Sequence, residues 1–297
     1  MATREHQAPP RVVRDGSASG RTAAPVFEVE GGPGHLTWSS FTELWEYREV
    51  LRAFVARQLK VRYKQAVVGA GWVLIQPLVG AALFALFLGH YAKIGSEGVP
   101  YLLFALAGMA AWGYFTGACN TGAESLIGNQ NLLRKIYFPR EVLPLTPVIS
   151  GLVDLGIAVG VYLVAALIEG ITPTWTWLAL PLPALILVWF AASIALGLSS
   201  LNIYYRDVRY VLPFVLQIGL FASPVTYSLS LIPDSWRTVY AILNPIAAAV
   251  DTLRRIVLHS QWPDPLVAFG ALGWSLLLTL AAYALFKRLE RGFSDRV

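Results

Sequence analysis

Six long segments of the chain carry almost no charge. Short polar connections separate them, and they cover residues 67–92, 101–121, 142–168, 179–203, 211–231 and 266–286. Each reaches the roughly 20 residues that a helix needs to cross the hydrocarbon core of a bilayer. The one formal charge inside them belongs to Asp154. The pattern predicts an all-α fold: a polytopic membrane protein whose six transmembrane helices occupy the domain 67–292.

The composition supports the same class of protein. Of the 297 residues, 56% are hydrophobic and only 14% are charged, whereas a soluble domain has about 25% charged residues. The single cysteine, Cys119, excludes an internal disulfide and a Cys-rich metal site. Residues 1–34 are rich in Ala, Pro, Gly and Arg and lack an apolar core, so we expect a flexible tail there.

Lysine and arginine residues gather on one side of the expected spans. Nineteen of the 23 lie there: ten before Val67, and then Arg134, Lys135, Arg140, Arg206, Arg209, Lys287, Arg288, Arg291 and Arg296. Because cytoplasmic loops retain such residues, both the tail and the C-terminal end 293–297 are predicted to be cytoplasmic. The net charge of +5 thus reflects membrane topology, and it gives no reason to expect a nucleic-acid partner.

An amphipathic helix is expected before the first span, over 38–64 within the segment 35–66. Ser40 and Glu43 have the spacing of a capping box. One face carries an apolar stripe of Phe41, Leu44, Trp45, Leu51, Val55 and Leu59, and Arg57, Lys60 and Lys64 lie outside it. Such a helix is typical of a cytoplasmic membrane surface. The same pattern also fits a helix that packs against its own protein.

Two predicted spans have a face that mixes aromatic and polar residues. These faces carry Trp72, Gln76, Phe84, Phe87 and Tyr91 in the first span, and Tyr210, Phe214, Gln217 and Phe221 in the fifth. They are candidates for a translocation path, because aromatic rings can slide along sugar faces without a fixed register. Ordinary helix packing with aromatic residues at the membrane interfaces is the alternative.

Asp154 and the segment 232–265 stand out for other reasons. A carboxylate at membrane depth is costly, so Asp154 is expected to face a neighbouring helix, as a structural hydrogen bond or as part of a route. Asn244 and Pro245 supply an N-cap followed by proline at the first helical position. An apolar stripe comes next, which predicts a short helix that dips into the outer leaflet before the last span.

Motifs for catalysis are missing from the sequence. It contains no G-x-x-x-x-G-K-[ST], so this chain has no P-loop to bind ATP. It contains neither HExxH nor G-x-S-x-G, and His90 and His259 are isolated in sequence. We therefore expect no catalytic residue, no metal and no bound cofactor in this chain, and we interpret it as a transport permease.

Two motifs resemble a known family. The segments LLRKIYFPREVLPL (132–145) and KVRYKQAVVGAGWVLIQPL (60–78) look like the permease subunit of ABC-2-type exporters. The likeness covers residues 38–292, and the group most similar is the polysaccharide exporters for O-antigen, teichoic acid and related lipid-linked glycans. It implies a homodimer that binds two copies of an ABC ATPase, with ATP and Mg on those partner subunits.

The resemblance also implies roles for particular residues. The segment 38–64 would be the interface helix, and the loop 124–138 the coupling helix that contacts the ATPase, through Ser125, Leu126, Asn129, Leu133, Arg134, Lys135 and Tyr137. Re-entrant helices between spans five and six would gate the exit, with Asn244, Pro245, Asp251 and Arg254. Arg206 and Arg209 would either contact an anionic headgroup, since guanidinium matches phosphate oxygens, or anchor the topology.

The expected function is therefore that of the transmembrane subunit of an ATP-driven exporter. It would move a lipid-linked polysaccharide from the cytoplasmic to the outer side of a bacterial inner or plasma membrane. Export of a small lipid or drug is an alternative within the same class. A membrane-embedded transferase acting on lipid-linked sugars is an alternative from another class, but it would need clustered acids, His or Arg at one membrane face.

Overall fold

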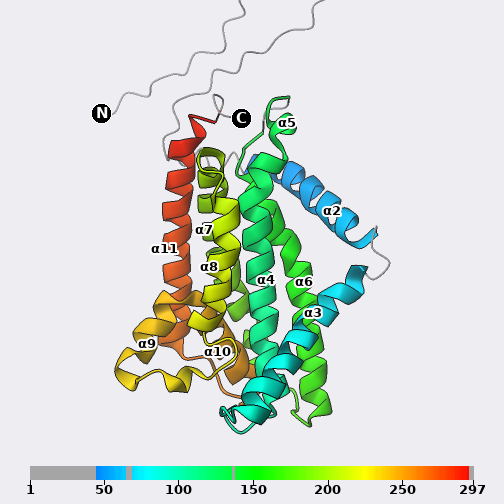
Figure 1. The fold of residues 1–297 in the computed structure, drawn as a ribbon, viewed down its shortest axis with the longest axis vertical. Coiled ribbons are helices and arrows are strands. Elements are labelled where there is room, and N and C mark those ends of the chain that lie inside the picture. The colour runs from blue at the N-terminus through cyan, green and yellow to red at the C-terminus, as the bar shows by residue number, and fades with distance from the viewer. Residues whose placement is uncertain (1–44, 65–68, 136–137, 294–297) are drawn as a thin grey trace, which may run out of the picture. The chain divides into compact units, whose positions relative to one another are not determined.

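Helices form all the regular secondary structure in the part of the chain that the structure describes (Figure 1). The computed structural model describes residues 45–64, 69–135 and 138–293. These ranges lie in the second of the two units into which the chain divides, Gly34–Val297. The predicted tail 1–34 and the predicted capping box lie outside the described residues. The predicted all-α fold is confirmed for the ranges above.

Within the described ranges, five helical segments are long and apolar enough to cross a bilayer. The first combines α3 (Gly69–Phe84) with the π-helical turn η1 (Ala85–Tyr91). The others are α4 (Tyr101–Gly128), α6 (Val142–Ile168), α7 (Pro181–Tyr204), which the short 3₁₀ helix η2 (Trp175–Ala179) precedes, and α11 (Pro265–Glu290). Each of the five coincides with a predicted span.

The predicted span 211–231 is not one helix, and that part of the prediction is wrong. Helix α8 covers Val208–Ala222, and Ser223 after it has an extended backbone. Fifteen residues extend about 22 Å as an α-helix, less than the roughly 30 Å of a hydrocarbon core. The apolar run continued past the end of the helix because 223–228 is buried as irregular backbone.

Two short helices come after that irregular segment and a 3₁₀ turn, η3 (Leu229–Leu231). They are α9 (Asp234–Leu243) and α10 (Pro245–Val257). The start of α10 agrees with the sequence: the Oδ1 atom of Asn244 accepts a hydrogen bond from the backbone N–H of Ala247 at 3.3 Å, and Pro245 is the first helical residue.

Helix α4 is the centre of the bundle. It contacts α3, α6, α7, α8 and α10, and α7 in turn packs along α11 (Figure 1). Small residues allow the close approach of α4 to α7: a Cβ atom added to Gly122 would lie 2.6 Å from the Cβ of Ala195. Such contacts are typical of helices that associate in membranes, where tight packing replaces the hydrophobic driving force.

Helix α2 (Arg48–Lys64) lies against α6 and α3. Val50, Leu51 and Phe54 are half-buried and pack on a core cluster, and the ring centroid of Phe54 is 5.6 Å from that of Phe138. Part of the predicted apolar stripe therefore faces the protein itself. Trp45 of the same stripe is 71% exposed.

The irregular segment after α8 is held by a buried arginine. The Arg254 guanidinium of α10 donates hydrogen bonds to the backbone carbonyls of Pro224 (3.0 Å), Val225 (2.5 Å) and Tyr227 (3.2 Å), and to that of Phe104 in α4 (3.1 and 3.2 Å). Burial lowers the pKa of Arg254 to about 10, so the group stays charged at neutral pH. These bonds supply the partners that non-helical backbone requires away from water.

Gly108 of α4 allows the irregular segment 223–228 to pack directly against that helix. A Cβ atom added at Gly108 would lie 1.9 Å from the carbonyl oxygen of Val225, which is backbone and cannot rotate away. We predict that Gly108→Ala lowers the melting temperature of the purified protein by roughly 5 °C, because overpacking costs about 1–3 kcal/mol.

Gly113→Ala is the matched control on the same helix, since no heavy atom lies within 4 Å of its added Cβ. Alanine is favoured over glycine in a helix, so this change should leave the melting temperature unchanged or raise it. Equal losses in both variants, measured by thermal unfolding in detergent, would contradict the close packing of the irregular segment on α4.

Candidate functional site

A cavity of about 870 Å³ opens among α2, α3, α4 and α6. Its wall combines aromatic, polar and charged side chains, notably Arg62, Trp72, Gln76, Trp112, Thr116 and Asp154. Trp72 and Gln76 belong to the path predicted from the first span. Gly113 and Gly117 contribute no side chain to the wall, which widens the space. The cavity can therefore contact apolar faces, hydroxyl groups and charges of one ligand.

Asp154 lies in this wall, in the middle of the 27-residue helix α6. Its two carboxylate oxygens accept hydrogen bonds from the Arg62 guanidinium and the Tyr63 hydroxyl, both at the end of α2. Burial and the bond to Asp154 raise the pKa of Tyr63 to about 12, so this hydroxyl stays protonated. Asp154 thus contacts a neighbouring helix, through a basic partner that the sequence did not indicate.

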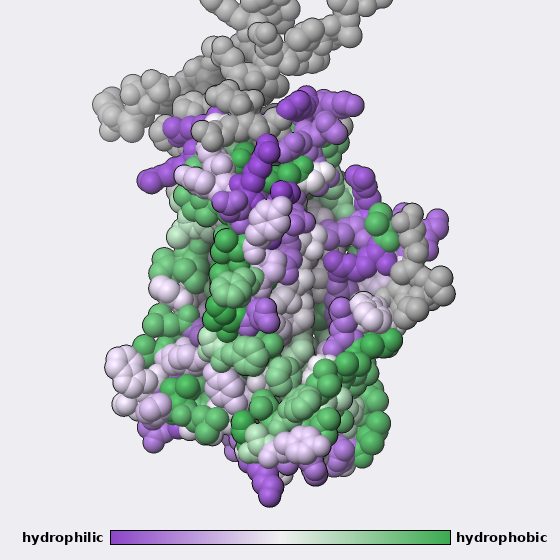
Figure 2. Space-filling view, in the orientation of Figure 1, coloured by the Kyte–Doolittle hydropathy of each residue, from purple (hydrophilic) through white to green (hydrophobic). Residues whose placement is uncertain are grey.

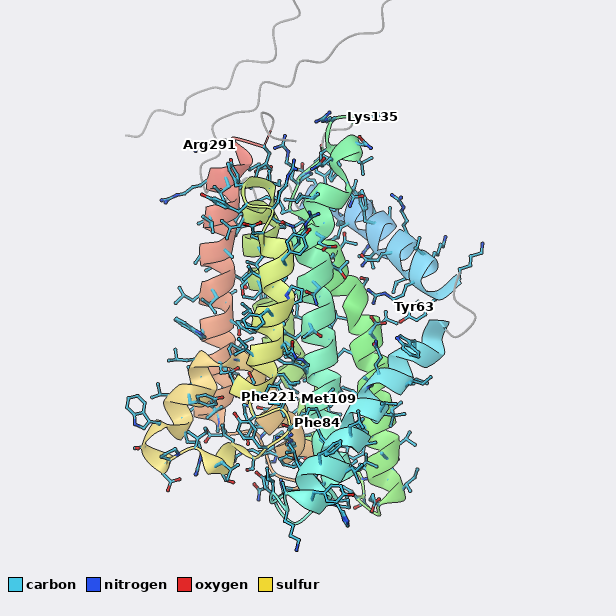
Figure 3. The ribbon with its side chains drawn as sticks, viewed as in Figure 1. Tyr63, Phe84, Met109, Lys135, Phe221 and Arg291 are labelled. Atoms are coloured by element: carbon cyan, nitrogen blue, oxygen red, sulfur yellow. The ribbon has the colours of Figure 1, made fainter. Side chains whose placement is uncertain are left out.

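The aromatic face of α8 lies apart from this cavity. Tyr210, Phe214 and Phe221 are 62–68% exposed, and Gln217 is exposed as well. Helix α4 contacts both α3 and α8, and Trp112 of α4 packs beside Gly219. Figure 3 places Phe84, Met109 and Phe221 at a similar height along the bundle. Among the described residues, the α8 face contributes none of those that line the 870 Å³ cavity.

The outer part of the first predicted face also lies outside the cavity. Phe87 and Tyr91 are 58% and 69% exposed on η1, while Phe84 and Met109 both pack against the same buried core cluster. Of the predicted path, only the end nearest α2 lines a cavity in the described part of the chain.

The predicted coupling segment divides into two parts. Helix α4 continues to Gly128, about two turns beyond its predicted end at Thr121, and it buries Leu126 completely. The Leu126 side chain is therefore not available at the surface of the single chain. Ser125 and Asn129 are half-buried, and the Asn129 amide donates to the Ser125 carbonyl at 2.8 Å.

The exposed part begins with the one-turn helix α5 (Gln130–Leu133). Leu133 is half-buried, while Arg134 and Lys135 are exposed. Lys135 lies at the tip of this end of the molecule, the end that also carries Arg291 (Figure 3). Tyr137 lies outside the described residues. Arg134 and Lys135 are thus the predicted coupling residues that are best placed to meet another protein.

Sequence reasoning missed a charged cluster beside this segment. Glu141 is fully buried and accepts hydrogen bonds from the Tyr283 hydroxyl at 3.1 Å and the Lys287 ammonium at 3.3 Å. Lys287 also contacts Glu290 at 3.0 Å, and Arg140 donates to the Glu290 carbonyl at 3.1 Å. Only the fold brings these groups together, because Glu141 and Lys287 are 146 residues apart. The cluster joins the connection after α5 to the end of α11.

Arg206 and Arg209 lie in polar grooves at the same end of the bundle. Both are exposed, and both line a groove of about 200 Å³ with Gln130 of α5. Arg209 also lines a groove of about 430 Å³ with Glu124, and its guanidinium lies over the Tyr210 ring at 4.8 Å. Both arginines are therefore accessible to an anionic group.

The predicted gate residues have different roles in the structure. Asn244 caps α10, and its amide donates to the Ser223 hydroxyl at 3.0 Å, next to the end of α8. Arg254 holds the irregular segment through its bonds to the backbone carbonyls. Asp251 instead pairs with Arg255 of the same helix at 2.7 Å, and burial raises the pKa of Asp251.

Glu97 connects three segments that are far apart in the sequence. It lies in the connection between η1 and α4, where it contacts the Ser228 hydroxyl and lies 3.0 Å from the Nε2 atom of His259. His259, which is isolated in sequence, therefore has an acidic neighbour in the fold.

Comparison with known proteins identifies the family. A family model described as ABC-2 type transporter matches residues 49–258. The chain is 29% identical over 258 residues to the O-antigen export system permease protein RfbA of Myxococcus xanthus, which covers 86% of this chain and 98% of the relative. A protein of the same name from Klebsiella pneumoniae is 26% identical over 255 residues, covering 83% and 94%.

A third relative is the polysialic acid transport protein KpsM of Escherichia coli. It is 22% identical over 246 residues, which cover 81% of this chain and 93% of the relative. These matches span the cavity, the irregular segment and α10 alike. The chain therefore belongs to the ABC-2 type transporter family and is a transport permease rather than an enzyme.

Proposed function

We propose that this chain is the transmembrane subunit of an ATP-driven exporter that moves a lipid-linked polysaccharide from the cytoplasmic to the outer side of the inner membrane. The observation that carries the proposal is the match to O-antigen export permeases over 94–98% of their own length. The cavity supports it, because two indole rings, an amide and a hydroxyl are groups that bind sugars well.

The proposed path lies between two copies of the chain. The aromatic face of α8 has no partner among the described residues that would cover it, and the cavity beside α3 is open on one side. A homodimer would bring the α3 face of each copy, with Trp72, Gln76 and Phe87, towards the α8 face with Phe214 and Phe221. Aromatic rings along this path would let a polymer slide without fixed hydrogen bonds.

Membrane placement can be proposed from the same geometry. Helix α8 and the buried segment after it would together cross the membrane as a sixth, broken span, with α9 and α10 as gate helices on the outer side. Non-helical backbone is tolerated at such depth only where protein shields it, and Arg254 supplies that shielding. Both termini would then be cytoplasmic, with α2 beginning at the cytoplasmic membrane surface and its other end reaching Asp154 in the middle of α6.

Energy would come from two copies of an ABC ATPase, which carry ATP and Mg. We propose that they contact α5 and the exposed Arg134 and Lys135. The buried cluster around Glu141 would transmit their motion to α11, because it joins the connection after α5 to that helix. Arg206 and Arg209, in the grooves beside α5, would meet an anionic headgroup near the entrance.

The path is tested by truncating its aromatic side chains. Phe221→Ala and Trp72→Ala should each lower the amount of polysaccharide at the cell surface at least threefold, because each removes a ring that supports the moving polymer. Phe269→Ala on α11 is the matched control, since Phe269 is 64% exposed and Phe221 is 62% exposed. Surface polysaccharide is measured by antibody or lectin at equal membrane levels of each variant, and equal export by all three would contradict the path.

The coupling surface is tested by charge reversal. The double variant Arg134→Glu, Lys135→Glu should lose most of the copurifying P-loop ATPase and most surface polysaccharide, while its melting temperature stays unchanged because both residues are exposed. Arg288→Glu, an exposed cation on α11, is the control and should retain both. Retention of the ATPase by the double variant would place the coupling surface elsewhere.

A further inference from the structure

The Arg62 guanidinium has more hydrogen-bonding capacity than its ion pair uses. It lies in the wall of the 870 Å³ cavity, and its side chain is 32% exposed. Among the residues that the structure describes, its hydrogen bond goes to one oxygen of Asp154. A guanidinium has five N–H donors in a planar fork. Arg62 can therefore bind a second anionic group without leaving the cavity wall.

Asp154 is arranged so that it can release Arg62. One of its oxygens accepts from Arg62 and the other from the Tyr63 hydroxyl. If Arg62 bound another anion instead, the Asp154 carboxylate would keep its hydrogen bond from Tyr63. The Asp154 side chain lines the cavity and is 20% exposed. A carboxylate with a second donor is less costly to leave behind than one without any partner.

The surroundings favour an anion at this point. The second half of α2 carries Arg57, Lys60, Arg62 and Lys64 and no acidic residue. Among the described residues that line the cavity, Asp154 is the one acid. Figure 2 shows hydrophilic residues over α2 and below it, towards α3, while α11 at the same height is mainly hydrophobic. A cluster of cations beside a low-dielectric wall raises the local concentration of anions.

The depth of the pair explains why a counter-ion is built in. Asp154 occupies the middle of α6, which is long enough to span the membrane. An arginine at such depth needs a negative partner at all times. Asp154 meets that need while the cavity is empty of substrate.

We propose that the Arg62–Asp154 pair is an exchangeable anion site, in which an anionic group of the transported molecule replaces Asp154 on the Arg62 guanidinium. The group is a phosphate on a lipid or a carboxylate on an acidic sugar, since the planar fork fits both. Trp72 and Trp112 in the same wall contact the apolar part of the ligand. The inference rests on the proposed function for the identity of the transported molecule, but the anion site is tested without transport.

The test measures binding to the purified full chain in nanodiscs of phosphatidylcholine, which offers no anionic lipid as a competitor. The probes are farnesyl diphosphate, farnesol and a hyaluronan tetrasaccharide. Arg62→Ala should weaken binding of the recognised anion at least tenfold. Asp154→Asn should strengthen it about threefold, because the competing carboxylate is gone. Arg288→Ala, which removes an exposed cation on α11, should have no effect.

If the ion pair were purely structural, Arg62→Ala and Asp154→Asn would both weaken binding of the anion. Opposite effects of the two variants therefore distinguish the proposed anion site from a structural pair. Binding of the diphosphate that depends on Arg62 assigns a lipid phosphate, and binding of the tetrasaccharide that depends on Arg62 assigns an acidic sugar. Three results would overturn the proposal: the same sign in both variants, binding of both anions that is equal in wild type and Arg62→Ala, or no binding of either anion.

Thermal unfolding of both variants checks that each is folded, and Arg62→Lys, which keeps the charge without the fork, should show intermediate affinity. Suppose that the two variants change anion binding as predicted, but that deleting the gene leaves surface polysaccharide unchanged. That combination would refute the proposed function and support the anion site. If export required the chain but Arg62→Ala and Asp154→Asn changed anion binding in the same direction, the proposed function would stand and the anion site would be refuted.

Discussion

The structure depends on one requirement, that backbone carbonyls away from water must have hydrogen-bond donors. The chain leaves helical geometry at Ser223 and stays buried until it reaches η3. Arg254 meets the requirement with one guanidinium, which bonds to carbonyls of the irregular segment and of α4. Gly108 lets the segment lie directly on α4. Because of this arrangement α8 can be short, and its aromatic face can remain uncovered beside the central helix.

Charged side chains join segments that are far apart in the sequence at two other places. Arg62 and Asp154 connect α2 to the middle of α6 at the edge of the cavity. Glu141 and Lys287 connect the segment after α5 to the end of α11. Glu141 is fully buried, so loss of Lys287 would leave an uncompensated charge, and this second pair fixes the relative positions of its two segments strongly. The first of these contacts lies in the wall of the cavity, and the second lies beside the proposed ATPase-facing surface.

Much of the fold could be predicted from local pattern. Long uncharged segments predicted five of the membrane-crossing helices, and Asn244 and Pro245 predicted the start of α10, because both signals are local. The end of α8 could not be found in this way. Pro224 disfavours helical geometry at Ser223, but a proline can also lie inside a span, as Pro147 does in α6, and it is Arg254 and Gly108 that accommodate the irregular backbone of 223–228. The burial of Leu126 could not be predicted either, because it depends on which helices pack around it. Arg62 and Asp154 are 92 residues apart, and no spacing rule pairs them.

Export of a finished or growing polysaccharide across the inner membrane is the activity that all the proposed roles serve. Deleting the gene and measuring the polysaccharide both on intact cells and in lysed cells tests that activity directly. Surface polysaccharide should disappear while the polymer remains detectable after lysis, and the wild-type chain supplied in trans should restore it to the surface. Normal surface polysaccharide in the deletion strain, or its absence from lysed cells as well as from the surface, would show that the chain does not export this polymer.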